Sequence, residues 1–154
     1  MVVPDMIKSL KYLLMALCLG ANFSLLAESS SEWQSPETVE GTVTISLEQA
    51  KEYHGFGMVF IDVRSPRQYS KRHIPGAINL FIKDEFTEAN LLKHVKKNTP
   101  FAIYCNGIHC SLSYKAAEKA VAWGFTQVKY FREGARGWRL AGNELEYGQA
   151  KAKP

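Results

Sequence analysis

The sequence lacks most of the patterns that would mark a nucleotide-, nucleic-acid- or metal-dependent protein. It contains no glycine-rich nucleotide loop, no paired-carboxylate site and no Ser-His-Asp spacing. Its Lys and Arg residues are scattered apart from the run at residues 93–97, so we expect no nucleic-acid partner. Because no internal repeat is found either, one compact domain is the expectation.

Cysteine is also scarce, and one of the three cysteines lies in an N-terminal segment that is typical of a secretory leader. Lys8 and Lys11 precede an apolar stretch at residues 12–26, and Ala27 offers a cleavage site. The segment predicts an exported protein, located in the periplasm; the alternative is an uncleaved anchor, the only case in which we expect a membrane contact. Cys18 follows Leu17 rather than a small residue, so lipidation is not expected.

The remaining chain has the composition of one globular domain, with 46% hydrophobic and 22% charged residues and a net charge of +4. We divide it into a leader or anchor at residues 1–27, a polar, flexible lead-in at 28–41, a domain at 42–147 and a tail at 148–154. Within the domain, β-like and helical patterns alternate. Strands are predicted at 43–45, 58–63, 77–80, 101–104 and 128–131. Helices are predicted at 47–53, 66–71, 111–123 and 135–141. A further helix is predicted to begin after a cap at Asp84 or Thr87 and to end at about residue 96. This alternation predicts an α/β fold with a mainly parallel central sheet.

The stretch at residues 101–123 carries the strongest candidate for chemistry. An apolar strand ends at Tyr104, the loop that follows begins with Cys105 and Asn106-Gly107, and Ser111 or Ser113 can cap a helix. A cysteine at the end of a strand, before a helix N-terminus, lies among unpaired N–H groups that stabilise a thiolate. We therefore expect the pKa of the Cys105 thiol to be lowered. The alternative is a buried structural cysteine.

Several motifs in register resemble a rhodanese-like domain. They are Ile61-Asp62-Val63-Arg64, Tyr69, His73-Ile74-Pro75-Gly76-Ala77-Ile78-Asn79-Leu80, Tyr104-Cys105 and Gly134 with Gly137-Trp138. The resemblance covers residues 46–142 and implies the small rhodanese fold, a five-stranded sheet flanked by helices. It also implies sulfur transfer, in which a cysteine takes a sulfane sulfur, becomes a persulfide and passes the sulfur to a thiol or cyanide.

Carried over residue by residue, the resemblance assigns the catalytic role to Cys105. The loop that would cradle its persulfide comprises Asn106, Gly107, Ile108, His109, Cys110 and Ser111. Asp62, Arg64 and His73 match recurring framework positions. No cofactor and no metal is implied; the partners are a small sulfur donor (thiosulfate, polysulfide or persulfide) and a thiol acceptor.

The loop departs from the family at two positions where thiosulfate-using members often carry Arg. Asn106 and Cys110 occupy these places, and neither supplies the fork-shaped charge that binds a dianion. The positive charges left to bind such a donor are His109 in the loop, if it is protonated, and Lys115 in the helix. We therefore expect the protein to bind free thiosulfate weakly. Two further departures lie outside the loop. Gln68 stands where Glu is common, which removes an expected ion pair with Arg64 or His73, and Glu133 replaces a common Gly.

Three alternative functions remain open. A Cys105/Cys110 pair could form a reversible disulfide, which would make the protein a thiol redox protein. Cys105, His109 and Cys110 could hold copper, although their spacing is not that of a zinc site. Rhodanese-like domains also serve as non-catalytic binding modules. A related phosphatase function is rejected, because Ser111 stands where a phosphate-binding Arg is required.

Overall fold

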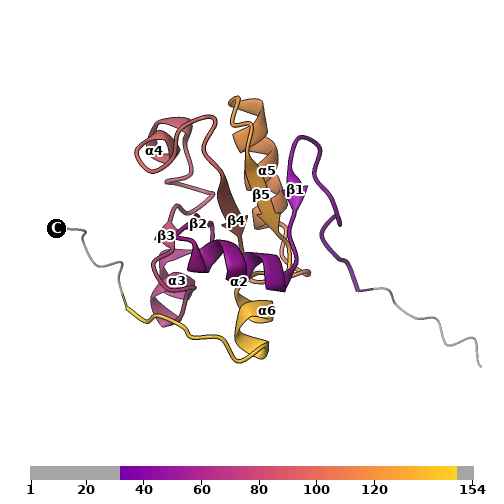
Figure 1. Ribbon diagram of the computed structural model, residues 1–154, viewed down its shortest axis with the longest axis vertical. Coiled ribbons are helices and arrows are strands. Elements are labelled where there is room, and N and C mark those ends of the chain that lie inside the picture. Colours follow the sequence, from indigo (N-terminus) through magenta and orange to yellow (C-terminus); the bar gives the residue numbers. More distant parts are fainter. Residues whose placement is uncertain (1–31, 149–154) are drawn as a thin grey trace, which may run out of the picture. The chain divides into compact units, whose positions relative to one another are not determined.

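Five short strands form one sheet in which every neighbouring pair runs parallel. The protein is described here from a computed structural model, which places residues 32–148 (Figure 1). The strand order is β1-β5-β4-β2-β3. The strands are β1 (Val43–Thr44), β2 (Val59–Asp62), β3 (Ile78–Asn79), β4 (Phe101–Tyr104) and β5 (Val128–Phe131). The predicted α/β fold with a five-stranded parallel sheet is confirmed.

Helices cover both faces of this sheet (Figure 1). They are α2 (Leu47–Gly55), α3 (Pro66–Lys71), α4 (Glu88–Leu92), α5 (Leu112–Ala122) and α6 (Gly134–Leu140). Buried residues of α4 and α5 share one apolar cluster with Ile61 and Ile103, whereas those of α2, α3 and α6 share a second cluster with Phe60 and Ala102. Successive strand residues thus point to opposite faces, as the pleat of a strand requires. A sheet covered on both faces explains why β4, and β2 up to its last residue Asp62, are apolar.

Local sequence signals set most helix ends. Ser46 caps α2 in a capping box with Gln49, and Ser65 caps α3 with Gln68 in the same way. The main difference lies in α4, which was expected to run to about residue 96 and ends at Leu92. After Leu92 the N–H group of His94 donates to the carbonyl three residues back, which tightens the chain into a turn.

The start of the described chain lies against the domain rather than standing free of it. We call residues 32–39 the N-terminal strap; in the sequence they belong to the expected flexible lead-in. The carbonyl of Ser35 accepts two hydrogen bonds from Arg132, at 3.0 and 2.8 Å, and Val39 is buried in the core. The strap is held by tertiary hydrogen bonds, which a polar local sequence does not reveal.

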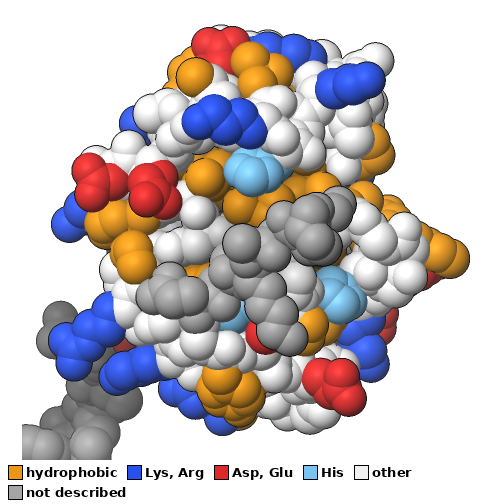
Figure 2. All heavy atoms as spheres, turned by 90° about the vertical axis from the view of Figure 1, so that its left-hand side faces the viewer, with side chains coloured by type: hydrophobic (Ala, Val, Ile, Leu, Met, Phe, Trp, Pro, Cys, Tyr) orange, Lys and Arg blue, Asp and Glu red, His pale blue; other side chains and the backbone are white. Residues whose placement is uncertain are grey.

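The described part of the chain contains no helix long and apolar enough to cross a membrane. The leader or anchor expected at residues 1–27 and most of the tail expected at 148–154 lie outside the described residues. On the face seen in Figure 2, Lys and Arg side chains lie at separate places among acidic ones and form no continuous stripe.

Candidate active site

The loop at residues 105–111 connects the carboxyl end of β4 to the first turn of α5. β4 is a central strand, paired with β2 on one side and β5 on the other, so the loop lies over the middle of the sheet. The start of α6 holds it: the N–H groups of Ala135 and Arg136 donate to the carbonyls of Cys105 and Asn106, at 2.9 and 2.8 Å. The carboxyl edge of a parallel sheet is the usual place for a site in such folds.

Cys105 is fully buried at the floor of this loop. Its sulfur lies 3.1 Å from the hydroxyl oxygen of Ser113 in α5, and 3.5 and 3.9 Å from the carbonyl oxygens of Cys110 and Gly107. Burial raises the pKa of the Cys105 thiol, and the neighbouring Cys110 raises it further, against smaller lowering effects of Ser113 and the Gly107 backbone. The expected lowering of this pKa is therefore wrong for this conformation of the loop, because desolvation outweighs the helix N-terminus.

Cys110, rather than Cys105, has the lowered pKa that the sequence predicts for the cysteine of this loop. It is only partly buried, and a hydrogen bond with the Cys105 thiol lowers the pKa of Cys110 to about 6, despite the opposing effect of its own burial. Hydrogen bonds with the backbone of Leu112 and Asn106 and the charge of Arg64 lower it further. Leu112 is the first residue of α5, so the helix N-terminus stabilises an anion on Cys110. Both cysteines are free thiols.

The other loop residues contribute mainly backbone groups. The carbonyl of Gly107 accepts a hydrogen bond from the N–H of Cys110 at 2.9 Å, and the carbonyl of Ile108 accepts one from Ser35 of the strap at 2.7 Å. His109 is exposed, and its Nδ1 lies 2.9 Å from the carbonyl oxygen of Trp33. Ser111 precedes α5 without a side-chain capping bond.

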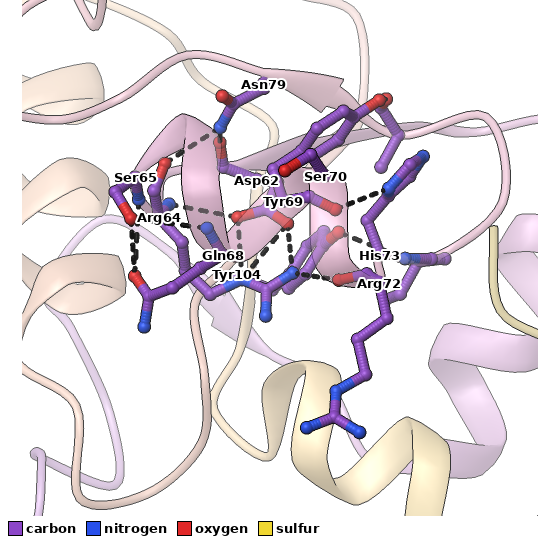
Figure 3. Close-up of polar contacts among 12 residues, drawn as sticks. Asp62, Arg64, Ser65, Gln68, Tyr69, Ser70, Arg72, His73, Asn79 and Tyr104 are labelled. Carbon is purple, nitrogen blue, oxygen red and sulfur yellow. Dashed lines mark hydrogen bonds and ion pairs between the residues drawn. The ribbon is translucent and has the colours of Figure 1, made fainter. Parts of the chain in front are cut away.

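The framework residues Asp62 and Arg64 form a buried ion pair beside the loop (Figure 3). Arg64 Nη2 and Nε donate to the Asp62 carboxylate at 2.6 and 3.1 Å, and Nη2 also donates to the carbonyl of Arg72 at 2.9 Å. Burial by itself lowers the pKa of the Arg64 guanidinium, but the hydrogen bonds and charge of Asp62 more than offset this and raise it. Asn79 donates to the carbonyls of Asp62 and Arg64, which fixes the end of β2.

His73 is buried next to this pair and has a structural setting. Its ring stacks on Tyr69 at 3.7 Å between centroids, and its Nδ1 lies 2.9 Å from the carbonyl oxygen of Tyr69. Its Nε2 lies 3.6 Å from the carboxylate of Glu146. Among the described residues, the Gln68 side chain hydrogen-bonds with Ser65 in the capping box of α3 and not with Arg64 or His73. Asp62 and Glu146 thus lie against Arg64 and His73, the two residues for which an ion pair with a Glu at position 68 is expected in the family.

Metal binding gains no support from the described residues, among which no group of three His, Cys, Asp or Glu side chains could hold a metal ion. His109 turns its Nδ1 to the strap, and Cys105 turns its sulfur into the domain.

Three features of the site escaped sequence reasoning. Ser113 was considered only as a helix cap, yet its hydroxyl contacts the Cys105 sulfur. Gly134 was noted only as part of a motif. It has a φ of +59°, and a Cβ atom there would meet the carbonyl oxygen of Cys105 and come within 3.0 Å of its carbonyl carbon. The strap contacts the loop through Ser35 and Trp33. Of these, only the glycine left a signal in the sequence, because a positive φ favours that residue.

Comparisons with known proteins agree with this geometry. A family model described as "Rhodanese-like domain" matches residues 46–141. The chain is 33% identical over 95 residues to the thiosulfate sulfurtransferase GlpE of Pseudomonas entomophila, a match that covers 62% of this chain and 83% of that protein.

Solved structures show the same fold. A thiosulfate sulfurtransferase from Pseudomonas aeruginosa is 25% identical with a TM-score of 0.62, and the match covers 71% of this chain but only 21% of that longer chain. The BH2092 protein from Bacillus halodurans is 26% identical with a TM-score of 0.62, covering 71% of this chain and 82% of that one. Together these likenesses support a function of the sulfurtransferase type.

Proposed function

Because the chain belongs to the rhodanese-like domain family, we propose that it is a sulfurtransferase whose Cys105 carries a sulfane sulfur as a persulfide. The observation that carries the proposal is the position of Cys105, at the carboxyl end of the central strand β4 and within 3.1 Å of the Ser113 hydroxyl. A hydroxyl at this distance can donate to a thiolate or persulfide sulfur and stabilise its charge.

In the loading step the Cys105 thiolate attacks the outer sulfur of a donor such as thiosulfate. A Cys–S–S bond forms, the sulfur–sulfur bond of the donor breaks, and sulfite leaves with the electron pair. In the unloading step a thiolate acceptor or cyanide attacks the terminal sulfur, and the Cys105 thiolate is the leaving group. Polysulfide and organic persulfides are donors of the same kind. Both steps require the loop to open, since Cys105 is fully buried in the described conformation.

The test is to incubate the reduced full-length protein with thiosulfate or polysulfide and to measure its intact mass. We expect wild type to gain one sulfur atom that cyanide removes again, and Cys105→Ser to gain none. Equal gain in wild type and Cys105→Ser would overturn the carrier role of Cys105. No gain with any donor would instead favour a non-catalytic binding module.

A second candidate function, a thiol redox protein, is favoured by the proximity of the two cysteines, since the Cys105 sulfur lies 3.5 Å from the carbonyl oxygen of Cys110. The Cys105 thiol also lowers the pKa of Cys110 to about 6. The Cys110 thiolate would attack the inner sulfur of a Cys105 persulfide. A Cys105–Cys110 disulfide then forms, and the outer sulfur leaves as hydrogen sulfide after taking up two protons. A dithiol reductant resets the pair.

This candidate is tested by measuring sulfide release from the loaded protein. Wild type should release hydrogen sulfide and end two hydrogen masses below the reduced, unloaded protein, whereas loaded Cys110→Ser should keep its persulfide. A wild-type persulfide as stable as that of Cys110→Ser would contradict the redox function and leave sulfur transfer unaffected. We also propose that the protein is exported, on the leader pattern alone; cell fractionation tests this.

A further inference from the structure

A pocket lined by arginine side chains lies directly beside the loop. It has a volume of about 230 Å³ and is lined by Arg64, Arg72, Asn106, Ala135, Arg136 and Arg139. These residues come from the end of β2, the end of α3, the loop and α6, so only the tertiary fold brings them together. Figure 3 shows the Arg72 side chain running from the end of α3 alongside α6, whose ribbon is yellow.

Three of the four arginines that line this pocket have no ion-pair partner among the described residues. Asp62 balances Arg64, but within residues 32–148 no carboxylate forms an ion pair with Arg72, Arg136 or Arg139. The lining contains no acidic side chain among the described residues. Like charges gathered in a concave, partly enclosed site raise the local potential and attract an anion.

Arg136 connects this pocket to the loop. Its side chain also lines a pocket of about 270 Å³ with Gly107, His109 and the acidic Glu133, and a small cavity of about 50 Å³ with Asn106 and Cys110. Its N–H group donates to the carbonyl of Asn106, which fixes the start of its side chain against the loop. An anion bound by Arg136 therefore lies next to the loop that holds Cys105.

We propose that Arg136, together with Arg72 and Arg139, binds the sulfonate end of a small dianionic sulfur donor of the thiosulfate class. The proposal rests on the proposed function and deepens it. Guanidinium groups bind oxyanions through paired hydrogen bonds, which Asn106 and Cys110 of the loop cannot provide. The charge that the loop lacks is thus supplied by α6 and the end of α3. The protein should therefore bind thiosulfate through residues outside the loop, although the loop itself lacks the arginines that the family uses.

Direct binding separates this inference from catalysis. Thiosulfate is titrated into full-length Cys105→Ser protein by calorimetry, with sulfate as an inert competitor of the same charge. We expect Arg136→Gln and Arg139→Gln each to weaken thiosulfate binding on the order of tenfold, and Arg136→Lys to weaken it less. Arg67→Gln is the matched control, because Arg67 is exposed on α3 and does not line the pocket.

Kinetics give the second readout. In the Arg136→Gln variant the KM for thiosulfate should rise. The reaction of the Cys105 thiolate with an uncharged organic trisulfide, which forms a mixed trisulfide and releases an organic thiolate, should stay within about twofold of wild type. In the Cys105→Ser background, thiosulfate binding that is unchanged by Arg136→Gln and Arg139→Gln, or that is absent altogether, would overturn the inference even if Cys105 of wild type takes up sulfur. Conversely, arginine-dependent binding without sulfur uptake would overturn the proposed function and leave the anion site standing.

Discussion

The sulfur of Cys105 lies 3.1 Å from the hydroxyl oxygen of Ser113, and both residues are buried between β4 and α5. The hydroxyl partly counteracts the effect of burial on this thiol, because it lowers the pKa of Cys105 while desolvation raises it. Ser113 is therefore a positioning and stabilising residue for the sulfur on Cys105, and it gives the first prediction.

Replacing Ser113 by Ala should slow reactions of the Cys105 thiolate. In a Cys110→Ser background, we expect sulfur uptake and alkylation of Cys105 to fall roughly tenfold, since a hydrogen bond to a charged group is lost. Ser111→Ala is the control, because Ser111 makes no side-chain capping bond. Equal rates in the two variants would show that Ser113 has only a packing role.

The two thiols should differ in their pH dependence. The pKa of Cys110 is lowered to about 6, so its reaction with iodoacetamide should rise through about pH 6 rather than near the ordinary thiol value. Cys105 is buried and its pKa is raised, so in folded protein it should react slowly at neutral pH. Peptide mapping of alkylated protein across a pH series measures both sites.

A variant pair tests the cause of the low pKa of Cys110. In Cys105→Ala the thiol donor is lost, and the alkylation profile of Cys110 should move to higher pH. In Cys105→Ser a hydroxyl donor remains, and the profile should move less. Identical profiles in wild type and Cys105→Ala would exclude the hydrogen bond as the cause.

The Asp62–Arg64 pair should contribute strongly to stability. Asp62→Ala leaves the Arg64 guanidinium buried without its carboxylate, and we expect a loss of about 3–5 kcal/mol in the free energy of unfolding. The double variant Asp62→Ala/Arg64→Leu should recover part of this loss. Asp84→Ala, at an exposed turn residue, should change it by less than about 0.5 kcal/mol. Urea denaturation compares the variants, and an equal loss in Asp62→Ala and Asp84→Ala would contradict the assignment.

Gly134 should tolerate no side chain. Its φ of +59° costs a non-glycine residue about 1–2 kcal/mol, and the contact with the Cys105 carbonyl adds overpacking of about 1–3 kcal/mol. Gly142→Ala is a matched control, since Gly142 has a φ of +74° with nothing within 4 Å of the added Cβ. Thermal denaturation should show a larger loss for Gly134→Ala, accompanied by slower sulfur uptake as the loop shifts. Similar losses in both variants would mean that the close approach has no energetic effect.

The N-terminal strap should be released by removing Arg132. The side chain of Arg132 holds the Ser35 carbonyl, and the Ser35 N–H holds the loop at Ile108. In Arg132→Gln, we expect hydrogen exchange of the Ser35 amide to accelerate on the order of tenfold. Lys129→Gln, a change of a basic residue three positions earlier in β5, is the control. Unchanged exchange would show that the other contacts of the strap hold it without Arg132.

Much of the fold could be predicted from the sequence, because the signals were local. Strands β4 and β5 and helix α3 were predicted with their observed bounds, since apolar runs and a proline-initiated capping box identify them within a few residues. Helix α4 was predicted too long, because no residue in the sequence marks its end at Leu92. The motif at residues 73–80 indicated the family, and the family model that matches residues 46–141 confirmed it.

The sequence by itself determined that a cysteine ends the central strand and that the loop after it lacks arginine. Only the tertiary structure decided which thiol is buried and which is acidic, because desolvation depends on contacts with Ser113 and the strands that flank β4. The tertiary structure also decided which arginine side chains lie beside the loop. Arg72 and Arg136 are 64 positions apart in the sequence, and folding alone places both in one pocket beside Asn106.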